Sequence, residues 1–504
     1  MSFNIYPLTE IEYSCKNYGI KINGIDVTPD TARVSAKPYN RRWPGHQRTL
    51  DQTELINFLS LSTDEPLNFE ITPAEKFEKV EIRPASLGII PEVKDGIIRF
   101  KLEKPAYFTV EPYSRRNALH IFVDPSADYD FDLNNENVIY YGKGIHEAGM
   151  ITLKSNQILF IDEGAVVYAC VNATDAENIK ILGRGILDNS HNKAKILFEV
   201  NAEDNETAVN NAERIHTIQL EYCTNVCIEG ITIRDSLVYN IRPIGCENLT
   251  IENVKLIGNW RYNSDGIDMH NCINVDIDNC FIRTFDDCIC VKGFDCYYDG
   301  DIEQAVKNAM YRNGKSYDKF KNVHIHNCTL WNDWGKCLEI GAETRAEEIF
   351  DIVFENCDII HVQGAPLDCY NIDYADVHDI IYRNINIQYD DVNPQAVYQY
   401  KDNEKYENLV NDYNSFPPLI RVDVSYHFEY SASGAKRGKN HDIIFENIHL
   451  SARQPVKIEF YGYDAEHKTK NVTVKDLYYN GEKITELPKE NFVKNEFCEN
   501  IKLI

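Results

Sequence analysis

The sequence predicts an all-β protein in which a parallel β-helix follows a small N-terminal β-sandwich domain. Three observations support this fold class. The chain has 504 residues, more than one compact core usually holds, so two domains or an elongated repeat are expected. Roughly the first quarter contains short alternating segments separated by turn residues. A strand signature then repeats along the rest of the chain, mostly at intervals of 23 to 29 residues.

Residues 1–130 form the predicted sandwich domain. Apolar and polar residues alternate there in several short runs, as in half-buried strands, at 79–84, 97–102, 107–111 and 119–124. The segment 126–137 is polar and acidic, and we interpret it as a linker to the second domain.

Residues 131–504 carry the repeat that predicts the β-helix. Each unit starts with Asn or Asp, continues with alternating apolar and polar residues, and ends at Asn, Asp or Gly. Units begin at Asn178, Asn225, Asn248, Asn274, Asn322, Asp351, Asp379, Asp442 and Asn471. A unit has room for short strands but not for a full helix, so helical and leucine-rich solenoids fit poorly. In a parallel β-helix the apolar residues of successive coils form one core, and repeated Asn side chains can form a ladder at a turn.

Two Tyr-rich insertions, near 294–320 and 388–437, interrupt the repeat. Loops of this length in a compact array are usually functional, and aromatic side chains beside a groove suit stacking on sugar rings. The alternative is a pair of surface loops packed on themselves.

Composition limits the partners. The net charge is −27 and the isoelectric point is about 4.9. Nucleic acid and anionic membranes would be repelled, so neither is expected as a partner. The same charge weakens, without excluding, a polyanionic polysaccharide as the substrate. A homo-oligomer is compatible with the sequence.

The N-terminal residues lack a basic segment followed by an apolar run, and no stretch approaches the ~20 apolar residues of a membrane span. The fifteen cysteines are odd in number, and many occupy apolar strand positions. We therefore expect a cytoplasmic protein with reduced thiols. Cys288 and Cys290 have no second pair at zinc spacing, and there is no glycine-rich phosphate loop, so neither a metal nor a cofactor is expected.

Three acids, Asp265, Asp286 and Asp287, stand out within strand-like sequence. Asp265 and Asp286 are 21 residues apart. If that interval is one coil, Asp265 lies over the Asp286–Asp287 pair, because adjacent strands are ~4.8 Å apart. Crowded carboxylates raise at least one pKa, as general acid/base hydrolysis requires. Consecutive strand residues face opposite sides, so the pair can share a cleft only if the chain kinks there. The competing interpretation is that these are ordinary turn residues.

The following coil carries Lys336, Glu339 and Arg345, which should stack next to the acid pair. We take them as candidate substrate-binding residues, with a solvated strand edge as the alternative. His270, His324 and His326 occupy strand positions, and we interpret them as ladder or core histidines rather than metal ligands.

The region from Leu237 to Gly341 resembles glycoside hydrolase family 28, the polygalacturonases. The motifs that carry the resemblance are Asn-Ser-Asp-Gly at 263–266, Asp-Asp-Cys at 286–288 and Gly-Lys-Cys at 335–337. The resemblance extends loosely to the family 49 dextranases, which also place a β-sandwich ahead of the helix. It implies a right-handed parallel β-helix and an inverting hydrolysis.

By this resemblance Asp286 is the general acid, Asp265 and Asp287 activate the water, and Asn263 and Lys292 lie in the sugar pocket. Inversion would separate acid and base by ~6.5–9.5 Å.

The sequence departs from the family pattern at two places. Lys336 stands where the family has the His of Gly-His-Gly. Asp368-Cys369-Tyr370 stands where the family has Arg-Ile-Lys, the pair that holds the galacturonate carboxylate. The substrate is therefore expected to be a plant or microbial oligo- or polysaccharide other than plain polygalacturonate, although Lys292, Lys336, Arg242 and Arg345 could rebuild an anion site.

Two alternatives remain open. A polysaccharide lyase or epimerase on the same fold would use a base such as Lys336. A β-helix that only binds glycan would not need the three acids.

Overall fold

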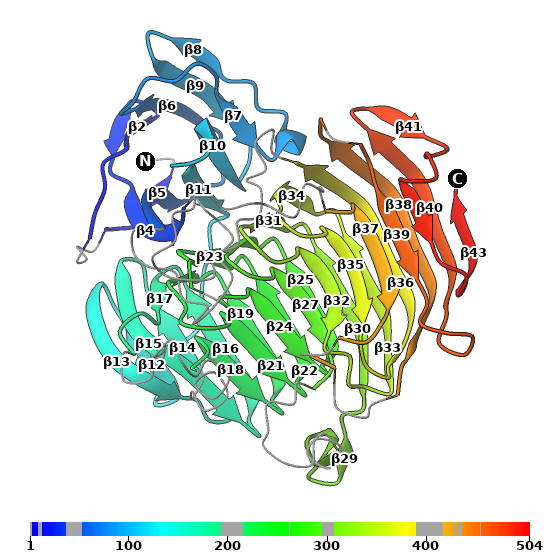
Figure 1. Cartoon of the computed structure of the whole chain (residues 1–504). Coiled ribbons are helices and arrows are strands. Elements are labelled where there is room, and N and C mark those ends of the chain that lie inside the picture. Colours follow the sequence, from blue (N-terminus) through cyan, green and yellow to red (C-terminus); the bar gives the residue numbers. More distant parts are fainter. Residues whose placement is uncertain are drawn as a thin grey trace, which may run out of the picture.

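The structure is a computed structural model that describes residues 3–8, 13–36, 53–192, 215–261, 263–294, 307–389, 417–427, 430–431, 436–453 and 455–504. It consists of an N-terminal pair of sheets and a long parallel β-helix, which Figure 1 shows side by side. The predicted fold class is confirmed.

Two antiparallel-rich sheets make up the N-terminal sandwich. The first has the order β1-β5-β11-β10-β7, with β4 paired to β5; the second has the order β3-β2-β6-β9-β8. The strands are β1 (Asn4–Ile5), β2 (Tyr18–Ile22), β3 (Ile25–Val27), β4 (Asp30–Ser35), β5 (Thr53–Ser62), β6 (Leu67–Pro73), β7 (Glu81–Arg83), β8 (Glu92–Lys94), β9 (Ile97–Leu102), β10 (Ala106–Arg115) and β11 (Leu119–Asp124), with a 3-10 turn η2 (Ala85–Leu87). Their inward apolar residues form a core of their own, centred on rings such as Phe69, Phe100 and Phe108.

The β-helix winds through three parallel faces. Face 1 holds β12 (Val138–Tyr141), β14 (Ile158–Ile161), β16 (Glu177–Gly183), β19 (Thr224–Glu229), β22 (Glu247–Glu252), β25 (Ile273–Asp278), β30 (Lys319–His326), β33 (Glu348–Glu355), β36 (Asp376–Gln388), β38 (Lys439–Ser451), β40 (Thr469–Tyr479) and β43 (Cys498–Leu503). Face 2 holds β13 (Gly144–Thr152), β15 (Ala165–Thr174), β17 (Ile186–Asp188), β20 (Thr232–Arg234), β23 (Lys255–Ile257), β26 (Phe281–Thr284), β31 (Thr329–Asn332) and β34 (Asp358–His361).

Face 3 holds β18 (Ile218–Glu221), β21 (Ile241–Ile244), β24 (Ile267–His270), β27 (Ile289–Lys292), β32 (Leu338–Ala342), β35 (Leu367–Asn371), β37 (Ile420–Val424), β39 (Ile458–Tyr461) and β42 (Phe492–Lys494). β41 (Glu482–Ile484) pairs antiparallel with β40. A hairpin of β28 (Tyr311–Arg312) and β29 (Lys315–Ser316) projects from the rod in Figure 1.

The repeated Asn of each unit marks a corner of the coil. Asn178, Asn225, Asn248, Asn274 and Asn322 all have left-handed backbone conformations, with φ between 55° and 59°. Asn tolerates this region better than most residues, because its short side chain can form local hydrogen bonds. Each side-chain amide of the last four donates to the side-chain oxygen of the Asn one coil earlier, at 2.7–3.0 Å. The Asn signature thus sets both the bend and the stacking of the coils.

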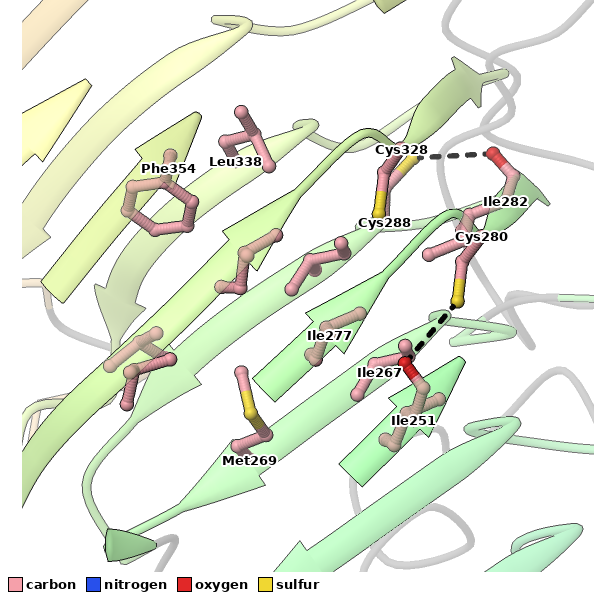
Figure 2. Packing of buried hydrophobic residues seen from close by; sticks show 14 of the residues in the cluster. Ile251, Ile267, Met269, Ile277, Cys280, Ile282, Cys288, Cys328, Leu338 and Phe354 are labelled. Atoms are coloured by element: carbon pink, nitrogen blue, oxygen red, sulfur yellow. Dashed lines mark hydrogen bonds between the residues drawn. The ribbon is translucent and has the colours of Figure 1, made fainter. Parts of the chain in front are cut away.

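Inside the helix, apolar side chains of successive coils stack into one continuous core. Ile251 and Ile277 come from face 1, Ile282 from face 2, and Ile267 and Leu338 from face 3 (Figure 2). All five are fully buried. This core fixes the register between coils, and with it the positions of the groups at the corners.

The sandwich packs against face 2. Phe122 of β11 contacts Phe281 of β26, with ring centroids 5.0 Å apart, and Trp331 joins the same cluster. Buried charges cross this interface as well: Arg115 of β10 lies 2.7 Å from Asp333, and Lys255 of β23 lies 3.0 Å from Asp124. The sandwich also reaches the corner that leads from face 2 into face 3, where the Ser35 hydroxyl donates to Asp333 at 2.8 Å.

Much of both predicted insertions lies outside the described residues, namely 295–306 in the first and 390–416, 428–429 and 432–435 in the second. The sugar-stacking role expected of their aromatic side chains therefore stays a prediction. Among the described residues, no helix is long and apolar enough to cross a membrane.

Candidate active site

The Asp286–Asp287 pair lies in a bend between β26 and β27, where face 2 turns into face 3. The Asp286 carbonyl accepts two hydrogen bonds, from Thr284 Oγ1 at 2.5 Å and from Asn332 Nδ2 at 2.6 Å. These bonds keep the segment out of the strand conformation. The two acids therefore need not point to opposite sides, as consecutive strand residues do, and both side chains are partly exposed.

Asp287 is held by the next coil. Its Oδ1 accepts a hydrogen bond from the backbone N–H of Lys336 at 2.7 Å. A Cβ on Gly335 would lie 2.2 Å from the same oxygen, so only glycine allows this approach. Burial alone would raise the pKa of Asp287, but the Lys336 ammonium, then Lys292, lowers it below its usual value.

Asp286 has the opposite environment. Burial, reinforced by the charge of Asp287, raises the pKa of Asp286 to about 7, although Lys292 and Lys336 oppose the rise. One of two adjacent carboxyls thus keeps its proton to near neutral pH while the other stays ionised. Such a separation distinguishes an acid from a base in one site.

Asp265 lies one coil earlier, just before β24. The register pairs Ile267 with Ile289, and the Gly266 N–H donates to the Asp287 carbonyl at 2.8 Å, so Asp265 is level with Asp287. Its side chain is only 2 % exposed. Burial raises the pKa of Asp265 well above its usual value, and the carboxylates of Asp268 and Asp286 add to the rise.

Lys292, at the end of β27, neutralises part of this acid group. Its Nζ lies 2.6 Å from Asp268 and 3.7 Å from both Asp265 and Glu343. The ammonium also faces the ring of Tyr239, 5.3 Å from its centroid. Lys292 is nearly buried, so its first role in the structure is to hold Asp265 and Asp268 together.

A row of charged side chains continues along the outer side of face 3. Lys336 Nζ donates to Glu339 at 2.6 Å, and Arg421 of β37 grips Asp368 of β35 with two bonds of 2.5 and 2.8 Å. Burial would lower the pKa of Lys336, but Glu339 and Asp287 raise it well above its usual value. The ammonium therefore stays charged.

The structure brings most of the predicted site residues together, and two of them are already paired within the protein. Glu339 is fully buried, and its carboxylate accepts a hydrogen bond from the Lys336 ammonium at 2.6 Å. Arg345, expected to bind substrate, is nearly buried: its guanidinium donates to the Phe294 carbonyl and lies 3.3 Å from Asp373. Asn263 is half-buried just before Asp265, with φ at 54°.

Sequence reasoning missed several groups that shape the site. Asp268 follows Asp265 within the same strand signature, and its spacing of three could have suggested a shared partner. Asn332 and Gly335 lie in the next coil, at the two ends of the bend that contacts Asp287. The glycine of the Gly-Lys-Cys motif at 335–337 was the sequence signal that could have identified this bend. The Asp368–Arg421 pair had no local signal, because the second insertion separates the two residues.

One trio inside the site, Asp287, Cys290 and Glu339, offers ligand atoms within 4.8 Å of one another. The Lys336 ammonium already contacts this trio through Glu339 at 2.6 Å, and its charge supplies the neutralisation that a cation would provide.

A parallel β-helix whose corner carries a partly buried group of carboxylic acids places the chain in the class of β-helix glycoside hydrolases. The family model of glycosyl hydrolases family 28 matches residues 142–411, more than half of the chain, and the chain belongs to that family.

Two curated relatives are similar over part of the chain. A polygalacturonase from Gossypium barbadense is 30% identical over 204 residues, which cover 38% of this chain and 47% of that protein. A probable polygalacturonase from Vitis vinifera is 27% identical over 251 residues, covering 43% and 48% respectively. The chain spans about half the length of the curated relatives it matches.

One solved structure extends the likeness to the whole fold. Dex49A from Penicillium minioluteum aligns with a TM-score of 0.56 at 13% identity, covering 98% of this chain and 90% of that chain. This coverage includes the sandwich, so the combination of sandwich and β-helix is shared. A hyperthermoactive exopolygalacturonase from Thermotoga maritima aligns with a TM-score of 0.46 at 18% identity, covering 73% and 83%.

Proposed function

We propose that the protein hydrolyses O-glycosidic bonds by an inverting general acid/base mechanism, with Asp286 as the acid. The observation that carries this proposal is the split between two adjacent carboxyls in one bend: Asp286 has a pKa of about 7, and Asp287 has a lowered pKa. An acid that holds its proton near neutral pH beside an ionised carboxylate is the pair that this chemistry needs.

In the proposed reaction the Asp286 proton moves to the glycosidic oxygen as the bond to the anomeric carbon breaks. The Asp287 carboxylate accepts a proton from a water that attacks the opposite side of the sugar ring, which inverts the anomeric configuration. Asp265 was also expected to activate the water. Its raised pKa and burial favour a narrower role, in which Asp265 and Asp268 hold Lys292 beside the acid pair.

The substrate class follows from the charges around the acids. Lys292, Lys336 and Arg421 each contact a carboxylate already, at 2.5–2.6 Å. A uronate would have to compete with these buried partners for a cation, and breaking a buried pair is costly. The names of the curated relatives favour a pectin-type polymer. We therefore propose a pectin-type oligosaccharide whose sugar at the cleaved bond is neutral, esterified or otherwise decorated.

The lyase or epimerase alternative is less well supported. Its candidate base, Lys336, would have to lose its proton, whereas Glu339 and Asp287 raise the Lys336 pKa despite burial. A glycan-binding protein without catalysis would have no need for two carboxyls with opposed pKa values.

The test is product release from a panel of neutral, esterified and free uronate oligosaccharides, followed by ¹H NMR, with wild type beside Asp286→Asn. We expect cleavage of a neutral or esterified member, an inverted anomer as the first product, and loss of cleavage in the variant. An unsaturated product would identify a lyase instead. Preferred cleavage of free polygalacturonate would contradict the substrate class while leaving the mechanism intact.

A further inference from the structure

We propose that the outer side of face 1 carries a divalent metal site formed by Asp276 of β25 and by His324 and His326 of β30. Each of the three offers one ligand atom, and these atoms lie within 4.8 Å of one another. The ion that suits two imidazoles and a carboxylate is a first-row transition cation, with Zn²⁺ as the leading candidate.

The strand geometry brings the ligands together. His324 and His326 are two residues apart in one strand, so both side chains point to the same side. The register pairs Asp276 with His324 and Asp278 with His326. The two imidazole rings stack with centroids 4.0 Å apart, directly beside the Asp276 carboxylate.

The distances approach those of a tetrahedral site. His326 Nε2 lies 3.4 Å from both carboxylate oxygens of Asp276, and His324 Nδ1 lies 3.8 Å from Oδ2. Bonds of ~2.0–2.1 Å to a tetrahedral zinc place neighbouring ligand atoms ~3.4 Å apart. The carboxylate–imidazole distances therefore lie within a few tenths of an ångström of those in a tetrahedral site.

The nitrogens that point away from this position are also held. His324 Nε2 lies 3.1 Å from Glu355, and His326 Nδ1 lies 2.9 Å from the Asn327 side-chain amide and 3.1 Å from Asp278. Arg383 fixes Glu355 in turn, with two bonds of 2.8 and 3.0 Å. A carboxylate on the far nitrogen is the usual partner of a metal-bound histidine, because it fixes the ring and makes the ligand more basic.

The site is also open to an ion from solution. Asp276 is 49 % and His324 41 % exposed at the side chain, so an ion can enter and keep a water as its fourth ligand. The histidines do stack as the ladder interpretation expects; the proposal adds a ligand, against the sequence-based expectation of no metal.

The position of the site gives the ion a structural role. The chain runs from β25 through β26 to the Asp286–Asp287 bend, then through β27 and the first insertion back to β30. An ion between β25 and β30 would tie together the two ends of this coil. The site lies on face 1, while the acids lie at the corner between faces 2 and 3, so the two can be tested separately.

The experiment uses the full-length chain, freed of metal with a chelator. We expect ZnCl₂ to bind at one ion per chain by calorimetry and to raise the melting temperature, and Co²⁺ to give the intense visible absorption of a tetrahedral site. The double variant His324→Ala/His326→Ala and the single variant Asp276→Asn should lose these signals. Glu355→Gln should weaken binding by about 10- to 100-fold, as loss of an outer carboxylate does.

A matched control is available on the same face. His378 and His441 also stack, with centroids 5.0 Å apart, and both pair with carboxylates, but each strand supplies only one of them. The variant His378→Ala/His441→Ala should bind Zn²⁺ as the wild type does. Absence of Zn²⁺ binding to the wild type, or binding that persists unchanged in His324→Ala/His326→Ala and in Asp276→Asn, would overturn the proposal.

Discussion

The proton on Asp286 offers the most direct test of the proposed acid. With a pKa of about 7, Asp286 is about half protonated at pH 7, whereas an ordinary aspartate with a pKa of about 3.9 would be protonated in roughly one molecule in a thousand. Its environment thus multiplies the competent acid several-hundred-fold. Between pH 6 and pH 8 the protonated fraction falls from about nine-tenths to about one-tenth, so kcat/KM should fall about tenfold.

A second perturbation should shift the dependence of kcat/KM on pH in a defined direction. Lys336 lowers the pKa of both Asp286 and Asp287, so Lys336→Met should shift the alkaline and the acid limbs of the profile to higher pH together. The assay is initial-rate product release on a substrate identified from the panel. Independently of any substrate, ¹³C NMR of labelled aspartate, with Asp286→Asn for assignment, reports the titration. A carboxyl midpoint near pH 4 for Asp286, or a flat profile from pH 6 to pH 8, would refute the reasoning.

Three further outcomes are expected. The folded-state pKa of Asp286 lies above its unfolded value, so this group favours folding at low pH and loses that contribution as pH rises through about 7. Asp286→Asn should therefore raise the melting temperature at pH 8 and leave it nearly unchanged at pH 4. A variant that melts at the same temperature as the wild type at pH 8 would contradict this. Gly335→Ala places a methyl group 2.2 Å from Asp287 Oδ1, so the carboxylate must move by about 1 Å and kcat should fall about 100-fold; Gly19→Ala, whose new Cβ meets nothing closer than 3.8 Å, is the control and should keep full activity. Arg421→Met leaves Asp368 buried without its bidentate partner and should lower the free energy of unfolding in urea by about 3 kcal/mol. Adding Asp368→Asn to the same chain should restore part of that stability. An unchanged urea midpoint would show that the pair contributes nothing.

The β-helix was predictable because the same residue types recur once per coil, at positions where few other side chains would fit. Asn at a left-handed corner and Ile or Val at inward positions recur once per coil, and the structure uses Asn248 and Asn274 for both bend and ladder. The same period placed Asp265 near Asp286 and Asp287. The register places it level with Asp287, one of the two acids over which the coil interval predicted it to lie.

The rest of the site depends on contacts between segments far apart in sequence. A sequence shows that Arg345 is charged but not that Asp373 and a backbone carbonyl already hold it. Nor does it show that the kink at Asp286 depends on Asn332, on the following coil. Periodicity predicts which coil a residue belongs to, whereas the partner of each charge is set by side-chain geometry at the corners.

The buried charges between the sandwich and face 2 have a consequence for protein engineering. Asp333 receives Arg115 and Ser35 from the sandwich and Arg283 from the helix, and it follows Asn332, the residue that shapes the acid-bearing bend. A chimera that grafts these coils onto another rod, without their N-terminal partner, would leave Arg283 and Asp333 in open solvent and loosen the adjoining corner. The smallest unit that can be transplanted is therefore the β-helix together with the N-terminal sandwich that covers face 2.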